Sequence, residues 1–336
     1  MTNKLTMLFI GLFMVISAFP VSAENDVKIE VLIAEDWGNK VGEFGIEKAG
    51  KTEDGYALDF FIAKDSIYIL DAINNRVQVF DLKGKFKKII KLQMKWQDFG
   101  LPREMTLFQN NLFFLVGKPP HYSANGIREI YKFTYNGEFI KRFGKEYIPK
   151  KREEYFYHLL SNENSAYIIC GLGGIKVLAF DGDGNLKDTL REASGKEVVE
   201  LMGIDVEGNP IISKIILGKK LSQTFLLDTK SKAVKEEIKD IYSWRDKDGN
   251  YYFIKTNNLR KKNDLITKID IYNPTTKLHK NIQMSGDIKT IKNNKEKLFR
   301  YQINFTEVAK VDADGNIYHL IALEDGVLLR KITWKN

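Results

Sequence analysis

Cysteine is nearly absent from this sequence: Cys170 is the only one among 336 residues. A single cysteine excludes an intramolecular disulfide. Cys170 lies in the segment AYIICGLGG, whose pattern is that of a β-strand, and we expect it to be a small buried apolar side chain.

The sequence also lacks the motifs of several enzyme classes. It contains no serine nucleophile elbow, no phosphate-binding loop and no dinucleotide fingerprint, and GLGG (171–174) is interpreted as a bend within a strand. The segments DGDGN and DADGN do not have the spacing of a calcium loop, so they are predicted to be turns. No nucleic-acid partner is expected.

Long apolar runs are absent except at the N-terminus. Lys4 precedes an apolar run of 15 residues, and the small residues Val21-Ser22-Ala23 follow. This order is typical of a signal peptide over 1–23, cut after Ala23, and predicts a periplasmic or secreted protein without a membrane span after cleavage. An uncleaved N-terminal anchor stays open as the alternative.

The charge is mildly basic. Removing residues 1–23 removes one lysine and no acidic residue, so the net charge falls from +8 to +7. Basic residues are spread along the chain, which favours a solvated surface, and the alternative is a patch that binds an anionic polymer or lipid headgroups.

What the sequence does contain is a repeat. Six segments, at 59–90, 104–144, 157–190, 201–238, 242–282 and 307–334, each alternate short apolar strands with turns containing Asp, Asn or Gly. A period of 40 to 50 residues with three or four strands per unit predicts an all-β, six-bladed β-propeller over residues 24–336. The last copy is about one strand short, so strand 26–36 is expected to complete the last blade and close the ring. Seven blades is the alternative, if the long interval before the last copy hides a blade.

One copy supports a resemblance to a known family. NKVGEFG (39–45) followed by DSIYILDAINNRVQVFDLKGKF (65–86) resembles the NHL-repeat type of six-bladed propeller found in exported bacterial proteins. The resemblance implies that Asp71, Asn74, Asn75 and Arg76 form a structural corner. There Arg76 would donate to carbonyl groups or to a carboxylate such as Asp59 or Asp71. A ligand-binding role for Arg76 is the alternative.

Propellers bind ligands where loops converge at one mouth of the central channel. His158 is the only one of the four histidines expected there, so a histidine-based catalytic centre is not favoured. Either the polar and aromatic residues at this mouth bind a ligand, or they plug the channel and pair with one another. The candidate ligand-binding residues are Tyr56, Arg103, Tyr157, His158, Trp244, Arg245 and Glu307.

The sequence therefore favours a monomeric binding or scaffold protein that recognises a protein or carbohydrate outside the cytoplasm through one face of the ring. A metal-dependent lyase or lactonase-type hydrolase at the channel mouth is the first alternative, and adhesion to an anionic surface polymer is the second. No cofactor is predicted under the favoured interpretation, whereas the enzyme alternative would require a divalent cation in the channel.

Overall fold

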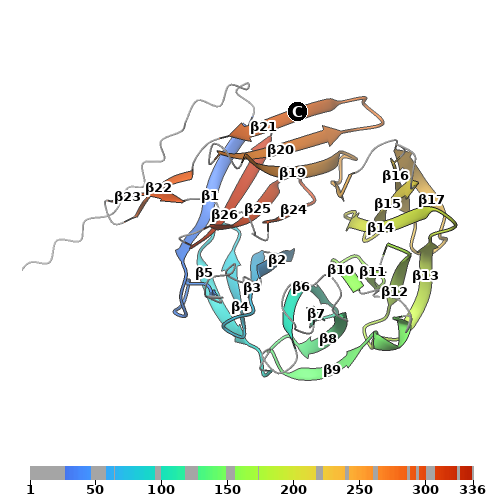
Figure 1. Cartoon of the computed structure of the whole chain (residues 1–336), viewed down its shortest axis with the longest axis horizontal. Helices are drawn as coiled ribbons and strands as arrows, with labels where there is room; N and C mark the ends of the chain where they lie inside the picture. Colours follow the sequence, from blue (N-terminus) through green and yellow to red (C-terminus); the bar gives the residue numbers. More distant parts are fainter. Residues whose placement is uncertain are drawn as a thin grey trace, which may run out of the picture.

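The computed structural model describes residues 27–46, 58–63, 65–94, 100–117, 128–148, 156–172, 174–216, 222–238, 242–259, 264–285, 288–292, 295–299, 307–323 and 326–334. Six four-stranded antiparallel sheets are arranged as blades around a common axis, which confirms the six-bladed propeller (Figure 1). No helix among these residues is long and apolar enough to cross a membrane.

The blades follow one another along the chain, and each begins with its innermost strand. Blade 1 contains β2 (Leu58–Ala63), β3 (Ser66–Asp71), β4 (Arg76–Asp81) and β5 (Phe86–Lys91). Blade 2 contains β6 (Leu101–Phe108), β7 (Asn111–Gly117), β8 (Arg128–Thr134) and β9 (Phe139–Phe143), followed by the short 3₁₀ helix η1 (Lys145–Tyr147). Blade 3 contains β10 (Phe156–Leu160), β11 (Ile168–Leu172), β12 (Lys176–Phe180) and β13 (Leu186–Glu192).

Blade 4 contains β14 (Glu197–Ile204), β15 (Pro210–Ile216), β16 (Ser222–Leu227) and β17 (Val234–Ile238). Blade 5 contains β18 (Trp244–Arg245), β19 (Tyr251–Leu259), β20 (Asp264–Tyr272) and β21 (His279–Ser285). Blade 6 contains β24 (Glu307–Val311), β25 (Ile317–Leu323), β26 (Gly326–Trp334) and, from the other end of the chain, β1 (Val27–Asp36).

The ring is closed by β1, as the sequence predicted. This strand pairs antiparallel with β26 from Val27 opposite Trp334 to Asp36 opposite Gly326, with one bulge near Ile33. Ile33 is buried in a cluster with side chains of blades 1 and 6. Both ends of the described chain therefore stabilise the same blade, and neither leaves an open edge at the seam.

The interval between blades 5 and 6 holds no further blade among the described residues. It contains a two-stranded hairpin, β22 (Ile288–Lys292) and β23 (Lys295–Phe299), which lies beside the ring in Figure 1. The long interval in the repeat pattern is thus an inserted hairpin, and the alternative of seven blades is not supported.

The hydrophobic core is divided into clusters that neighbouring blades share. Blade 1 packs on blade 2 through Leu70, Val77, Met105 and Phe114, all less than 1% exposed. Blades 2 and 3 share a second cluster, and blades 3 and 4 a third. The strand pattern explains this division, because the second strand of blade 1, β3, is buried at every position and packs on both faces.

Tight turns join the first strand of a blade to the second, and the third to the fourth, so they lie at one end of the ring, here called the turn end. In the predicted turn DGDGN, the carboxylate of Asp181 accepts hydrogen bonds from the backbone N–H of Asp183 and of Asn185, each at 2.9 Å. Gly184 has a φ of 77°, a left-handed conformation that glycine adopts without strain. GLGG, in contrast, is not a bend within a strand, because β11 ends at Leu172 and the turn to β12 follows.

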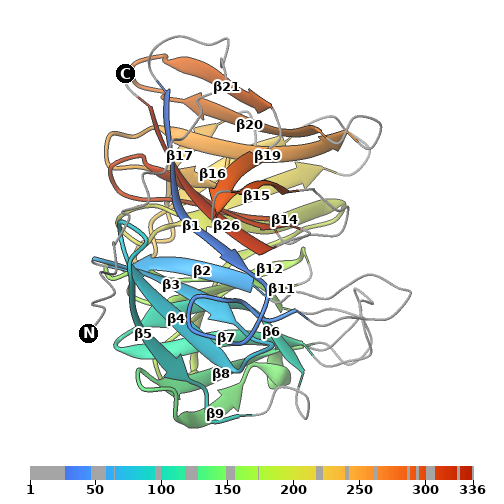
Figure 2. The same ribbon diagram turned by 90° about the vertical axis from the view of Figure 1, so that its left-hand side faces the viewer.

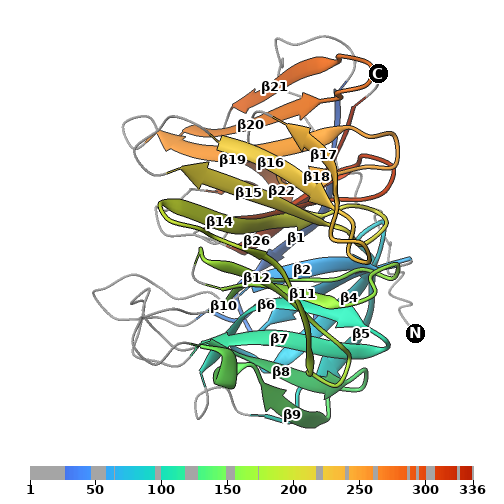
Figure 3. The same cartoon turned by 90° about the vertical axis from the view of Figure 1, so that its right-hand side faces the viewer.

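The turns also contact one another across blades. The side-chain amide of Asn162 donates to the carbonyl of Asp205 at 2.8 Å, and that of Asn164 to Val206 at 2.7 Å, which joins blade 3 to blade 4. Lys247 forms a 2.7 Å ion pair with Asp314 and so joins blade 5 to blade 6. Figures 2 and 3 show the strands of the blades crossing between this end and the opposite one.

Candidate functional site

Four charged side chains from the innermost strands of four blades interact near the axis of the ring, and we call them the central cluster. Asp59 of β2 and Lys310 of β24 form an ion pair of 3.2 Å. Glu104 of β6 lies 3.4 Å from the imidazole Nδ1 of His158 in β10. The side chains of Asp59, Glu104 and Lys310 are 4%, 23% and 15% exposed, whereas that of His158 is 49% exposed.

The two carboxylates of the cluster also link consecutive blades. The innermost strand of a blade has one edge without a partner strand, so its backbone N–H groups require other acceptors. The backbone N–H of Met105 donates to Asp59 at 2.7 Å, and those of Leu159 and His158 donate to Glu104 at 2.7 and 3.2 Å. Asp59 therefore ties blade 1 to blade 2, and Glu104 ties blade 2 to blade 3.

Two of the predicted site residues, Arg103 and His158, lie at β-bulges on neighbouring innermost strands. The register shifts between Pro102 and Glu104 in one strand and between Tyr157 and Leu159 in the other. A bulge leaves its extra residue out of the ladder and re-aims the side chain, and both of these residues are exposed. His158 has a φ of 52°, which is uncommon for a residue other than glycine.

The electrostatics of the cluster favour a charged histidine. Burial alone would raise the pKa of Glu104, but the facing His158 and the N–H of Leu159 outweigh it and hold the pKa at about 2. Desolvation opposes the charge of His158, yet Glu104, with smaller contributions from Asp59 and Glu200, raises the pKa of the imidazole above its usual value. The pKa of Asp59 is raised because burial exceeds the effect of Lys310.

Trp244 and Arg245 do not lie with Arg103 and His158. They form the whole of β18 and come directly before the hairpin turn 246–250, so they lie toward the turn end of the ring. Trp244 packs against a hydrophobic cluster shared by blades 5 and 6. Trp244 and Arg245 therefore do not share a surface with Arg103 and His158.

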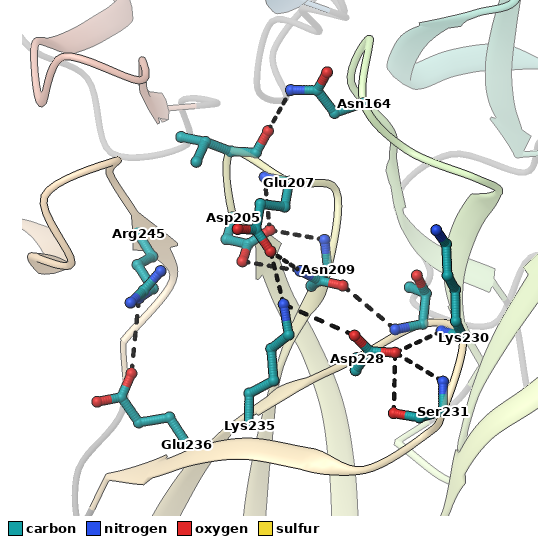
Figure 4. Close-up of polar contacts among 12 residues, drawn as sticks. Asn164, Asp205, Glu207, Asn209, Asp228, Lys230, Ser231, Lys235, Glu236 and Arg245 are labelled. Carbon is teal, nitrogen blue, oxygen red and sulfur yellow. Dashed lines mark hydrogen bonds and ion pairs between the residues drawn. The ribbon is translucent and has the colours of Figure 1, made fainter.

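Arg245 belongs to a polar network at the turn end (Figure 4). Its Nε lies 3.7 Å from Glu236, and its guanidinium lies over the ring of Tyr251. Beside it, Lys235 pairs with Glu207 at 2.6 Å and with Asp228 at 3.8 Å. The pair of Arg245 with Glu236 connects blade 5 to blade 4, and the two pairs of Lys235 join the turns of blade 4 to one another. The contacts of Arg245 are therefore with the scaffold.

The remaining candidates can be placed only in part. Tyr157 lies in β10 and Glu307 at the start of β24, where the structure describes their backbone but not their side chains. Tyr56 lies outside the described residues.

The four corner residues of blade 1 hold the segment that connects blade 6 to blade 1. Arg76 donates to Asp71 at 2.7 Å and to three backbone carbonyls, those of Asn39, Lys40 and Glu43. Asn74 donates to the carbonyl of Gly38 at 2.8 Å and to Asp71 at 2.9 Å, and Asn75 adopts a φ of 51°. The side chain of Arg76 is only 7% exposed, so little of it is accessible to a ligand.

The partner of Arg76 is Asp71, not Asp59, which was the other carboxylate considered. Asp59 pairs with Lys310 instead. Sequence reasoning thus missed three members of the central cluster: Asp59, Glu104 and Lys310. The available signal was a charged residue next to an apolar one in three of the innermost strands, as in LDF (58–60), REM (103–105) and AKV (309–311).

In the described part of the chain, no three His, Cys, Asp or Glu side chains are grouped as metal ligands would be. The carboxylates best placed near the axis, those of Asp59 and Glu104, are already engaged by cations and backbone N–H groups. The arrangement can hold a charged imidazole and an exposed guanidinium next to the axis, which suits the recognition of polar or anionic groups.

Comparisons with known proteins show a similarity of fold. No family model matches the chain. Over 151 residues it is 24% identical to the protein brain tumor of Drosophila melanogaster, a match that covers 44% of this chain and only 13% of that protein. Among solved structures, an oligogalacturonate lyase in complex with manganese has a TM-score of 0.51 and 9% identity, over 84% of this chain and 78% of that one. A protein of Bacteroides fragilis described as exported has a TM-score of 0.47 and 11% identity, over 95% and 98% of the two chains.

Proposed function

We propose that this chain is an extracytoplasmic binding propeller that recognises a protein or carbohydrate through the end of the ring opposite the turn end. The observation that carries the proposal is the pair of bulged residues, Arg103 and His158, on adjacent innermost strands. Both side chains are exposed, both residues belong to innermost strands, and both side chains carry donors for a polar or anionic ligand. The signal peptide predicted over 1–23 and the resemblance of segments 39–45 and 65–86 to exported propellers support the location.

The two ends of the ring differ in a way that supports this choice of face. At the turn end, side chains and backbone groups of consecutive blades bond to one another, as in the contact of Asn162 with Asp205. These groups are committed to the scaffold. His158, in contrast, keeps half of its side chain exposed although Glu104 fixes its backbone, and backbone strain held by its surroundings is a feature of binding sites.

Binding can be tested with immobilised protein and two sources of ligand: a panel of bacterial and plant polysaccharides, and an extract of extracytoplasmic proteins. The variant Arg103→Ala/His158→Gln should lose at least tenfold in affinity for whatever the parent protein captures, since two charge-assisted hydrogen bonds are removed. Lys247→Gln, at the turn end, is the matched control. Equal capture by the double variant and the control would refute the proposed face.

A metal-dependent lyase or hydrolase at the same site is the alternative. The lyase in complex with manganese shares the fold of this chain, and a cation here would have to displace Lys310 from Asp59 or His158 from Glu104. A rise in melting temperature with Mn²⁺ or Ca²⁺ that Glu104→Gln abolishes would support this alternative. No shift with either ion would leave binding as the function of the site.

A further inference from the structure

The positive charge of the protein is concentrated on the outer strands of two adjacent blades. Residues 81–91, which include β5, and residues 136–142, which include most of β9, together contain seven lysine or arginine residues and two acidic ones. Their net charge of +5 compares with +8 for the whole chain. In sequence these residues are spread over two repeats, and the fold brings them to neighbouring positions at the outside of the ring (Figure 1).

The end of β5 contacts the turn that leads into β9. The backbone N–H of Gln93, just after β5, donates to the carbonyl of Gly137 in the turn that leads into β9, at 2.9 Å. A Cβ atom on Gly137 would lie 2.1 Å from the carbonyl oxygen of Lys91, so the turn rests directly on the end of β5. The ammonium group of Lys88 lies 4.3 Å from the ring centre of Tyr135 in blade 2. We call residues 83–91 and 139–142 together the basic rim.

Most of the charge on the basic rim is not neutralised by the described part of the protein. All five lysines between residues 83 and 91 are exposed. Lys87 pairs with Asp65 at 3.1 Å, and no described acidic side chain forms an ion pair with the other four. The carboxylate of Asp81 accepts hydrogen bonds from the backbone N–H groups of Lys83 and Lys85 and so serves the turn.

The same rim exposes a pair of apolar side chains. Phe139 and Ile140 are 40% and 42% exposed, and they are two of the four large hydrophobic side chains exposed among the described residues. Ile140 is the extra residue of a bulge in β9, between the positions that pair with Lys132 and Phe133. A soluble polyanion would require only the lysines. Lysines that flank exposed aromatic and aliphatic side chains match a lipid surface, where the charges meet headgroups and the apolar groups enter the interface.

We propose that the basic rim docks the protein peripherally on a membrane surface containing anionic phospholipids. This function is separate from ligand recognition at the axis, because it uses the outermost strands of blades 1 and 2 rather than the innermost ones. The rim supplies lysine ammonium groups for lipid phosphates and Phe139 with Ile140 for the acyl boundary.

The test is co-sedimentation of the protein with vesicles. The parent protein is used as it is isolated, and every variant has the same N-terminus as the parent. The probe vesicles are phosphatidylcholine with about one third phosphatidylglycerol, and pure phosphatidylcholine is the neutral comparison. The variant Lys83→Gln/Lys85→Gln/Lys91→Gln removes three exposed charges. The control Lys196→Gln/Lys230→Gln/Lys268→Gln makes the same change at exposed positions in blades 4 and 5 and in the connection before blade 4.

Each lysine close to an anionic membrane contributes roughly fivefold to binding, so the rim variant should bind anionic vesicles about a hundredfold more weakly than the parent protein. The control should change the partition by less than about threefold, because charges beyond a Debye length are screened. Equal weakening by the two triple variants would overturn the proposal, and so would equal binding of the parent to neutral and anionic vesicles.

Ile140→Ser separates a lipid surface from a soluble polymer. It should weaken binding to anionic vesicles several-fold and leave retention on heparin unchanged, because only the membrane offers an apolar phase. Retention on heparin without vesicle binding would show that the rim takes a polyanion instead and would refute the lipid proposal. Thermal unfolding of each variant provides the check that the ring remains folded.

Discussion

Replacing Glu104 with glutamine should destabilise the protein in a manner that depends on pH. The carboxylate accepts the backbone N–H of Leu159 at 2.7 Å and that of His158 at 3.2 Å, and it faces the imidazole of His158. Its pKa falls from 4.5 to about 2 in the folded protein. At about 1.36 kcal/mol per pKa unit, ionised Glu104 contributes on the order of 3 kcal/mol to the free energy of unfolding near neutral pH.

The lowered pKa of Glu104 determines how the free energy of unfolding changes with pH. A depressed carboxyl pKa gives stability that is fully present above the unfolded value of 4.5 and is lost as pH falls toward 2. Glu104→Gln should therefore cost about 2 to 3 kcal/mol at pH 7 and very little near pH 2. His158 behaves in the opposite sense: since its pKa is raised, its contribution is present below its unfolded value of 6.5 and is lost as pH rises through the folded pKa.

Urea denaturation between pH 2.5 and pH 8 measures this difference, with urea chosen because it does not screen charges. Glu163→Gln is the matched control, since this glutamate is exposed in the turn after β10. If Glu104→Gln destabilises the protein equally at pH 3 and pH 7, the charge of Glu104 is not what joins blades 2 and 3, and the reasoning is wrong.

Two further predictions concern the scaffold. Arg76→Ala should lower the free energy of unfolding by about 3 to 5 kcal/mol, because it leaves the fully buried carboxylate of Asp71 without its cation, and a loss below about 1 kcal/mol in denaturant titrations would contradict this. Ile33→Asp should lower the melting temperature by more than about 10 °C, since it places a charge in the cluster that joins blades 1 and 6, and an unchanged melting curve would show that β1 does not close the ring.

The number of blades and their closure could be predicted from sequence because the information is local. Alternating apolar residues define each strand, and the Asp-x-x-Gly turns mark where strands reverse, as at Asp181 and Gly184. The missing strand of the last copy and the unmatched strand at the N-terminus then favoured six blades closed by strand 26–36, with seven blades as the alternative. The paired strands β1 and β26 confirm it.

The position of β18 could not be predicted in the same way. The segment IYSWRD (241–246) was interpreted as a loop leading into an innermost strand, but Trp244 and Arg245 within it are the innermost strand of blade 5, which is only two residues long and ends at the turn. Two residues carry no period, so a sequence pattern cannot fix where along the axis they lie. Trp244 and Arg245 were consequently grouped with Arg103, from which the structure separates them.

The central cluster was missed for a related reason. Asp59, Glu104 and Lys310 lie beside apolar residues in innermost strands, and each has its partner in another blade. Such contacts depend on how consecutive blades are rotated about the axis, which strand patterns do not specify. The five lysines between residues 83 and 91 are close together in sequence, but their position next to the turn before β9 depends on the packing of two repeats.

The two proposed surfaces occupy opposite edges of the same blades, and their energetics should be independent. In blade 1, three strand spacings of about 4.8 Å separate β2 from β5, so the central cluster and the basic rim are about 14 Å apart. Effects of substitutions at such distances add when the sites share no partner. A variant that combines both sets should therefore lose as much ligand affinity as Arg103→Ala/His158→Gln alone. It should lose as much vesicle binding as the three rim substitutions alone. If the axis variant also weakened vesicle binding, the ligand and the membrane would share one surface, and the assignment of His158 to ligand recognition would fall.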